Sequence, residues 1–332
     1  MTITTLEHQL AHHKQFLQIL SQIDLILQSM NYSKIMTPLL SPVLIAESYL
    51  EVYESQFISM GNKQKQYLIP STELFLKRLI AKGIGNCYSL EKNFRNSEPN
   101  TTRHSPEFMM LEMYKVNADY MEVAEDVLAL FQSLAHFLYN KNEITFHDKT
   151  ISFDGWEKIT VTEAFDKHAG IKNIVDEHSL RDQAKIKGYT TDGFTYSEMW
   201  SQIYAQEVEP HLGTNGKPTI IYEYPKELGA TAQINTEKGV AERLEIYIDG
   251  VEIGNCGNSA QEGVDWNDME QRFLKEEVLR KELGKVDHPP DREFISILKS
   301  MPKTAGIAIG VERLVMILLN LQSIQELQII RV

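Results

Sequence analysis

The chain has 332 residues, 42% hydrophobic and 24% charged, which is ordinary for a globular enzyme. Its formal net charge of −13 argues against general nucleic-acid binding, because coating DNA or RNA requires a basic face. The polar start, 1–13, lacks the apolar stretch of a secretory signal, and no segment reaches the roughly 20 apolar residues of a membrane span. With only two isolated cysteines, the sequence predicts a cytoplasmic protein that has no membrane segment and no disulfide framework.

Hydrophobic periodicity gives the elements of the first part of the chain. In chain order they are a helix over 7–31, a strand over 32–40 interrupted at Pro38, a helix over 73–82, strands over 86–94 and 108–116, and a helix over 120–139. The two strands at 86–94 and 108–116 flank a polar segment, which predicts a hairpin with a long loop.

The second part contains a charged and mostly helical insertion at about 150–215. The elements expected after it are strands over 219–224 and 243–255, a helix over about 266–283, a helix capped by residues 288–291, and a last amphipathic helix from 311. Hairpins and helices without regular β-α-β alternation predict an α+β fold with a mostly antiparallel sheet flanked by helices.

The polar loop and the strand after it have the chemistry of a ligand site. Arg95 opens the loop, and a loop guanidinium can hold an anionic phosphate. In the next strand Phe108, Met110, Glu112 and Tyr114 share one face, so an aromatic ring could stack on a purine while Glu112 and Tyr114 bind an amine. The alternative is that Phe108 and Met110 belong to the core and Glu112 is a surface acid.

A second hairpin is predicted around Asp249 and Gly250, because Asp-Gly between alternating hydrophobic residues is a strong two-residue turn signal. Pairing from that turn makes Glu245 a diagonal neighbour of Glu252 on the same face. Mg²⁺ prefers one or two carboxylates together with substrate phosphates, which this pair could provide. The alternative is a solvated hairpin face.

A second arginine follows two glycines near a strand-to-helix turn. Gly306 and Gly310 permit close backbone approach, and Arg313 lies at the start of the last helix, where anions are favoured. The histidines have no spacing typical of transition-metal ligands. Two arginines and two carboxylates together suit a nucleoside triphosphate with its metal.

Taken together, these segments resemble the three signature motifs of class II aminoacyl-tRNA synthetases of the lysyl branch. The matching segments are the first helix with the Pro38 strand, residues 94–112 and residues 306–313, and residues 240–255 are especially lysyl-like. The resemblance implies one catalytic domain over 1–332 with the insertion at about 150–215, no N-terminal OB-fold anticodon-binding domain, and a homodimer.

Within this branch the chain looks like the freestanding paralogues that ligate (R)-β-lysine to elongation factor P. The shared phrases are 208–210, 217–219, 232–234 and 288–301, and Ala308 stands where lysyl-tRNA synthetases tend to have Gly. The resemblance implies activation of lysine, β-lysine or a related amino acid by ATP and transfer to a lysine of elongation factor P. The alternatives are a ligase with another acceptor (a carrier protein, a small molecule or a tRNA) and a non-catalytic regulatory paralogue.

The resemblance also implies roles for individual residues, with Arg95 and Arg313 as the catalytic pair. The ATP-binding residues would be Arg95, Glu98, His104, Phe108, Glu245 and Arg313, and the magnesium ligands Glu245 and Glu252. The amino-acid pocket would consist of Glu73, Glu112, Tyr114, Asn255, Glu262 and Ala308.

Two segments depart from the family, and one of them is the Arg95 loop, which is about one residue longer than in lysyl enzymes and resembles the asparaginyl branch at residues 100–104. After the acidic hairpin the family usually reads Asn-Gly-Phe-x-Glu, whereas residues 255–262 are about three residues longer and lack the aromatic. Glu262 would then be a displaced pocket acid. The ATP-binding motifs are intact, but the identity of the amino acid is open.

Overall fold

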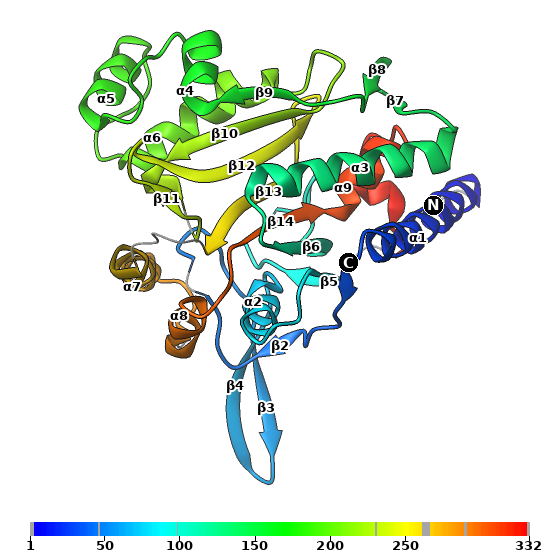
Figure 1. The fold of residues 1–332 in the computed structure, drawn as a ribbon, viewed down its shortest axis with the longest axis horizontal. Coiled ribbons are helices and arrows are strands. Elements are labelled where there is room, and N and C mark those ends of the chain that lie inside the picture. Colours follow the sequence, from blue (N-terminus) through cyan, green and yellow to red (C-terminus); the bar gives the residue numbers. More distant parts are fainter. Residues whose placement is uncertain are drawn as a thin grey trace. The chain divides into compact units, whose positions relative to one another are not determined.

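The computed structural model describes residues 3–330 apart from residues 46, 98, 230, 261–265 and 289–290. The chain forms an α+β fold of mostly antiparallel strands with flanking helices, as predicted (Figure 1). Its internal contacts divide it into two compact units, of which unit 1 comprises residues 1–119 and 259–332 and unit 2 residues 120–258.

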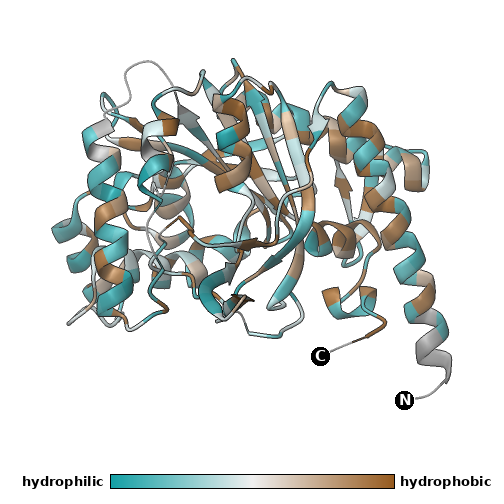
Figure 2. Ribbon diagram, turned by 90° about the horizontal axis from the view of Figure 1, so that it is seen from below, coloured by the Kyte–Doolittle hydropathy of each residue, from teal (hydrophilic) through white to brown (hydrophobic). Residues whose placement is uncertain are grey.

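Unit 1 contains a sheet in the order β1-β5-β6-β14, in which β1 is parallel to β5 and the other pairs are antiparallel. These strands are β1 (Ser33–Lys34), β5 (Cys87–Phe94), β6 (Glu107–Val116) and β14 (Thr304–Gly310). The helices of unit 1 are α1 (Ile3–Ser29), α2 (Glu73–Ala81), α7 (Trp266–Glu282), α8 (Arg292–Leu298) and α9 (Val311–Leu318). The α1 helix has hydrophobic and hydrophilic stretches along its length (Figure 2).

Packing of α2 against α8 builds one core of unit 1. Leu76 and Ile80 of α2 are buried in a cluster with Phe294 and Leu298 of α8. Asp291 caps α8 as predicted, since its Oδ1 accepts the backbone N–H of Phe294 at 3.1 Å. These contacts hold α2 against α8, and the first residue of α2 is the predicted site residue Glu73.

A small sheet in unit 1 has the order β2-β4-β3 and was not predicted. Its strands are β2 (Leu40–Ser41), β3 (Glu54–Ser59) and β4 (Asn62–Leu68), and β3 and β4 form a long hairpin (Figure 1). The strand predicted over 32–40 is not continuous, because only Ser33–Lys34 of β1 and Leu40 of β2 belong to strands there. Pro38 lacks an N–H for a ladder, which is a physical reason for the interruption.

Unit 2 contains the strands β13-β12-β10-β9 in that order, with β11 paired to β12. These are β9 (Glu157–Thr160), β10 (Thr219–Pro225), β11 (Ile234–Asn235), β12 (Val240–Ile248) and β13 (Val251–Ala260). Helix α3 (Tyr120–Tyr139) has the predicted bounds, and β7 (Glu143–Phe146) and β8 (Lys149–Ser152) form a separate hairpin.

The insertion at about 150–215 is mostly helical, as its composition indicated. Its helices are α4 (Val161–Ala164), a π-helical turn (Phe165–Ala169), α5 (Glu177–Ile186), α6 (Tyr196–Ile203), a second π-helical turn (Tyr204–Val208) and a 3-10 turn (Glu209–His211). Figure 1 shows α4, α5 and α6 beside β9 and β10. Phe165, Trp200 and Tyr204 of this segment share one core with Tyr224 and Tyr247 of the strands.

Two further findings bear on the composition. Among the helices in the described part of the chain, none has the length and apolarity needed to cross a bilayer. Cys87 and Cys256 are both buried and free, and burial raises the pKa of the Cys87 thiol to about 12.

Candidate active site

The Arg95 loop is closed by the β5–β6 hairpin in unit 1, as predicted. Asn93 pairs with Phe108, and the Arg95 N–H donates to the Pro106 carbonyl at 2.9 Å, so the two ends of the loop are held together. The Arg95 guanidinium lies 5.3 Å from the centroid of the Phe108 ring. The two groups predicted for phosphate and adenine are therefore neighbours.

Arg313, at the start of α9, contacts the same loop. Its Nε donates to the Arg103 carbonyl at 3.0 Å, and the Thr102 carbonyl accepts the Ile324 N–H at 2.9 Å. The Thr101 hydroxyl and His104 Nδ1 are 3.2 Å apart. The structure thus brings both predicted catalytic arginines and His104 to one loop of unit 1. Glu98 lies outside the described residues.

The predicted one-sided face of β6 is present, and Glu112 is its most buried acid. Glu112 is 1% exposed, and its Oε1 accepts the Ser71 hydroxyl at 2.6 Å and the Thr72 N–H at 3.0 Å. Its Oε2 is buried and has no hydrogen-bond partner among the described residues. Burial raises the pKa of Glu112 to about 7, and nearby Glu73 adds to the increase. Glu112 is therefore not the surface acid of the alternative interpretation.

Ala308 and Gly306 lie beside this acid on β14. Ala308 pairs with Glu112 and Gly306 pairs with Tyr114, so all four residues share one face. A Cβ on Gly306 would lie 2.2 Å from the Tyr114 ring, so only glycine leaves room for that ring. Ala308 and Glu112, which were both predicted for the amino-acid pocket, are thus direct neighbours across β14 and β6.

Glu73 is the first residue of α2, and it forms an ion pair with Lys77 one turn later. Lys77 is only 2% exposed, and its Nζ lies 5.9 Å from the Tyr114 ring centroid. The charge of Glu73 is therefore offset by a buried cation that the sequence analysis did not identify. The i, i+4 spacing of Glu73 and Lys77 was the available signal.

Glu47 is a second residue that the sequence analysis missed. Its Oε1 accepts the Tyr49 hydroxyl at 3.0 Å. Burial raises the pKa of Glu47 to about 7, Glu73 adds to the increase, and Arg95 opposes it. Glu47 is thus an acid near Glu73 and Arg95, and its loop position gave no periodic signal.

In unit 2 the acidic hairpin has the predicted turn. Ile248 pairs with Val251 and Tyr247 with Glu252 across Asp249 and Gly250, which both have positive φ. Because Glu245 is two residues from Tyr247, Glu245 and Glu252 project from the same face, as expected. The register then shifts between Ile246 and Tyr247, which is a β-bulge that was not predicted.

The bulge determines where Asn255 points. Ile253 is the extra residue, so Glu245 pairs with Asn255 instead of Gly254. Asn255 therefore joins Glu245 and Glu252 on one face, and its Oδ1 accepts Arg243 Nε at 3.3 Å. Regular alternation would have placed Asn255 on the opposite face from Glu252. Glu262 lies outside the described residues.

Glu245 is buried and its two oxygens bind protein donors. Oε1 accepts Arg243 Nη2 at 2.6 Å, and Oε2 accepts the Tyr247 hydroxyl at 2.8 Å. Burial raises the pKa of Glu245, Arg243 opposes this, and Glu252 adds to it. Arg243 also stacks on the Tyr224 ring at 4.6 Å, so the ion pair is embedded in unit 2.

The donor chemistry of this face fits magnesium. Mg²⁺ takes oxygen ligands and is often bound by one or two carboxylates plus phosphate oxygens, and Glu245 and Glu252 are two carboxylates close enough to interact electrostatically. Each carboxylate oxygen has two lone pairs, so the bonds to Arg243 and Tyr247 leave Glu245 with coordination capacity. Among the described residues no group of three or more His, Cys, Asp or Glu has the geometry of a self-sufficient metal site.

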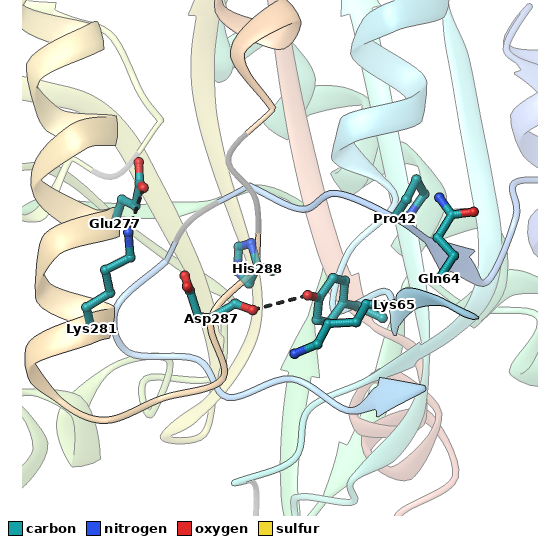
Figure 3. A pocket seen from close by; sticks show the side chains of 8 residues that line it. Pro42, Gln64, Lys65, Glu277, Lys281, Asp287 and His288 are labelled. Carbon is teal, nitrogen blue, oxygen red and sulfur yellow. Dashed lines mark hydrogen bonds and ion pairs between the residues drawn. The ribbon is translucent and has the colours of Figure 1, made fainter. Parts of the chain in front are cut away.

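Unit 1 also has a surface pocket of about 470 Å³ (Figure 3). Its labelled side chains come from β4 and from α7 with the segment after it: Gln64, Lys65, Glu277, Lys281, Asp287 and His288, together with Pro42. None of the predicted site residues lines it. Its mixed charges specify no ligand class.

Comparison with known proteins gives concordant results. The family model described as tRNA synthetases class II (D, K and N) matches residues 5–330. The lysine–tRNA ligase of Escherichia coli (strain K12) is 31% identical over 322 residues, which cover 93% of this chain and 61% of that protein. The lysine–tRNA ligase of Shigella flexneri is 32% identical, with the same coverage.

The chain thus spans about three fifths of the length of these lysine–tRNA ligases. A relative of more similar length is the elongation factor P–(R)-beta-lysine ligase of Enterobacter sp. (strain 638), which is 30% identical over 87% of this chain and 85% of its own length. The match over nearly all residues, together with the α+β fold and the two hairpins, leads to one conclusion: the chain belongs to the family of class II tRNA synthetases (D, K and N).

Proposed function

We propose that this protein is an ATP-dependent ligase that activates lysine, β-lysine or a related amino acid as an aminoacyl-adenylate. The acceptor in this proposal is a lysine side chain of elongation factor P. Support comes from the family match, and from a relative of similar length that is named for this ligation.

The observation that carries the proposed substrate class is the state of Glu112. An ionised carboxylate with 1% exposure, one of whose oxygens has no donor among the described residues, is energetically unfavourable unless a cation compensates it or a proton neutralises it. A substrate ammonium group supplies both the positive charge and the missing N–H. The same face of β6 contains Phe108, which lies against Arg95, so an amine site and an anion-binding arginine belong to one hairpin.

The proposed residue roles follow the predicted groups. Arg95, Arg313, Glu98, His104 and Phe108 would bind ATP, and Glu245 and Glu252 would hold Mg²⁺. The amino acid would be bound by Glu73, Glu112, Tyr114, Asn255, Glu262 and Ala308.

The chemistry requires no covalent nucleophile on the protein. An oxygen of the substrate carboxylate attacks the α-phosphorus in line, and the bond to the bridging oxygen breaks so that pyrophosphate leaves with the electron pair. Arg95 and Arg313 would stabilise the charge that develops on the phosphates, and positioning of the two substrates lowers the barrier further. Magnesium, when bound, would neutralise phosphate charge. The acceptor amine then attacks the acyl carbon, AMP leaves, and the amine loses a proton.

Amino-acid-dependent exchange of pyrophosphate into ATP, across a panel of α- and β-amino acids, tests the first step. We expect exchange with at least one amino acid that has a second amino group. Exchange with none of the panel would contradict the proposal and favour a non-catalytic regulatory paralogue.

Glu252→Gln should abolish this exchange, because it removes one of the two proposed magnesium carboxylates. The matched control is Glu237→Gln, since Glu237 is an exposed glutamate of the same unit. Near-normal exchange in Glu252→Gln would remove Glu252 from the metal site.

The acceptor is tested separately. Mass spectrometry of elongation factor P after incubation should show an added aminoacyl group, and a parallel tRNA acylation assay should show none. Acylated tRNA with unmodified elongation factor P would instead favour tRNA as the acceptor.

We also propose that the protein is a cytoplasmic homodimer. The isolated cysteines favour a reducing compartment. Leu17 and Leu25 on α1 are 49% and 60% exposed and Met36 is 83% exposed, which gives the first predicted motif apolar surface for a second copy. Light scattering should give a molar mass twice that of the chain. The Leu25→Glu variant should give the mass of a single chain.

A further inference from the structure

Three buried tyrosines meet beside Glu245 in unit 2. The Tyr204 hydroxyl is 3.1 Å from the Tyr247 hydroxyl and 3.2 Å from that of Tyr224. It is also 3.5 Å from Glu245 Oε2, to which the Tyr247 hydroxyl donates at 2.8 Å. All four residues are less than 10% exposed, so these bonds are largely shielded from water.

The number of hydroxyl hydrogens determines which group donates and which accepts in each hydrogen bond of this cluster. A phenol has one hydrogen, and an ionised carboxylate only accepts. When Tyr247 donates to Glu245 and Tyr204 donates to Tyr247, Tyr224 must donate to Tyr204. The bonds then form an ordered chain from Tyr224 through Tyr204 and Tyr247 to the carboxylate, and each bond polarises the next.

Tyr204 differs from the other two tyrosines in its origin. Tyr224 and Tyr247 lie on β10 and β12, whereas Tyr204 starts the π-helical turn that follows α6 in the insertion. Its ring stacks on Trp200 with centroids 4.5 Å apart and an interplanar angle of 16°, and it also stacks on Phe165 at 6.2 Å. Such π-turns are rare and are frequently found at functional sites.

The other side of Glu245 is also held. Arg243 binds Oε1 at 2.6 Å, so the carboxylate is restrained at both oxygens. A ligand acid held by its own hydrogen-bond partners coordinates a metal without first losing rotamer freedom.

We propose that Tyr204 is a positioning residue: through Tyr247 it fixes the orientation of Glu245 and so couples the helical insertion to the carboxylate face of the β12–β13 hairpin. This inference rests on the proposed function, because it assigns Glu245 to a magnesium-binding face. The insertion at about 150–215 would then orient a residue of the magnesium-binding face, in addition to packing against the sheet.

The test measures metal binding directly on the full chain. The probe is Mn²⁺, followed by the electron paramagnetic resonance of the free ion, with an ATP analogue whose α,β-bridge is methylene so that no adenylate forms. We expect Tyr247→Phe, which removes the direct donor, to weaken Mn²⁺ affinity about tenfold. Tyr204→Phe should weaken it about threefold, because it acts through one more link.

Two further variants distinguish positioning from packing. In the Tyr247→Phe background, Tyr204→Phe should add little, since only the longer 3.5 Å contact between Tyr204 and Glu245 is left to lose. The matched control is Tyr196→Phe on α6, because that buried hydroxyl donates to the Ile174 carbonyl at 2.9 Å, away from Glu245. Its Mn²⁺ affinity should equal that of the wild type even if its melting temperature falls.

The outcomes separate the two proposals. Wild-type Mn²⁺ affinity in both Tyr204→Phe and Tyr247→Phe would overturn the inference and leave the proposed function standing. A wild-type protein that binds no Mn²⁺ beyond the analogue's own complex would overturn both. If Tyr204→Phe does not fold, unchanged affinity in Tyr247→Phe alone overturns the inference, because the proposal assigns the effect of Tyr204 to its 3.1 Å bond with Tyr247 and not to its longer, 3.5 Å contact with Glu245.

Discussion

Two buried glutamates, one in each unit, lie in the interior of a strand and have opposite environments. Glu245 on β12 binds a guanidinium at one oxygen and a phenol at the other. Glu112 on β6 binds only a neutral hydroxyl and a backbone N–H, both at Oε1, while Oε2 has no donor among the described residues. Within the described part of the chain, the first acid therefore has a counterion, and the second has one oxygen that no protein donor binds.

Glu245 thus already has its charged partner within the protein, whereas we expect Glu112 to obtain one from a ligand. A buried, ionised carboxylate without a cation lowers the stability of the folded protein. A bound ligand with a positive charge offsets this cost. Glu245 should therefore matter to the folded protein by itself, whereas Glu112 should matter mainly when the amino acid binds.

Glu245→Gln should give the largest effect. The substitution leaves the Arg243 guanidinium, which is 18% exposed, without its carboxylate, and the free energy of unfolding should fall by about 3 kcal/mol. Urea denaturation without ligands measures this, with the exposed Glu237→Gln as the control. A loss as small as that of the control would mean that Glu245 does not depend on its ion pair.

Glu112→Gln should come next and act on substrate binding. The concentration of amino acid for half-maximal exchange should rise about 100-fold, since a buried charged hydrogen bond to the ammonium is lost. The concentration of ATP for half-maximal exchange should stay near that of the wild type. An equal rise for ATP would show that Glu112 is not specific to the amino acid.

The pH dependence of stability gives a third effect. The pKa of Glu112 is raised from 4.5 to about 7 by burial, so in this interval the unfolded chain loses the proton while the folded chain keeps it. The folded state therefore loses stability as pH rises from about 4.5 to about 7. Relative to the wild type, Glu112→Gln should gain roughly 3 kcal/mol between pH 4.5 and pH 7.5. A constant difference across this range would contradict burial of an ionisable group there.

Ser71→Ala should have the smallest effect. It removes one of the two donors to Glu112 Oε1 and should lower the free energy of unfolding by about 1 kcal/mol at pH 7.5. Because the lost bond favours the ionised carboxyl, the pKa of Glu112 should rise further. The pH at which amino-acid binding is half-maximal should then increase, and a shift to lower pH would refute this assignment.

Local sequence signals predicted much of the fold. Asp249 and Gly250 suit positive φ, so their turn and the pairing of Tyr247 with Glu252 followed from the sequence. The turn of the β3–β4 hairpin is formed by Met60 and Gly61, and Met rarely adopts positive φ. That hairpin therefore had no turn signal and was missed.

The candidate site was predictable where it depends on strand alternation. The shared face of Phe108, Glu112 and Tyr114 needed only the period of two. The bulge at Ile253 had no local marker, and it reverses the side on which Asn255 lies. The burial of Lys77 depends on tertiary packing, which a single segment does not encode.

The bulge at Ile253 interrupts the regular alternation of side chains between the two faces of β13. Glu252 lies next to the turn, before the bulge. From Gly254 onward, each residue lies on the face opposite to the one that regular alternation from Glu252 would give. Changes in the downstream segment can therefore accumulate without rotating Glu252 away from Glu245. The side chains after the bulge and that of Glu252 are thus set by different parts of one strand.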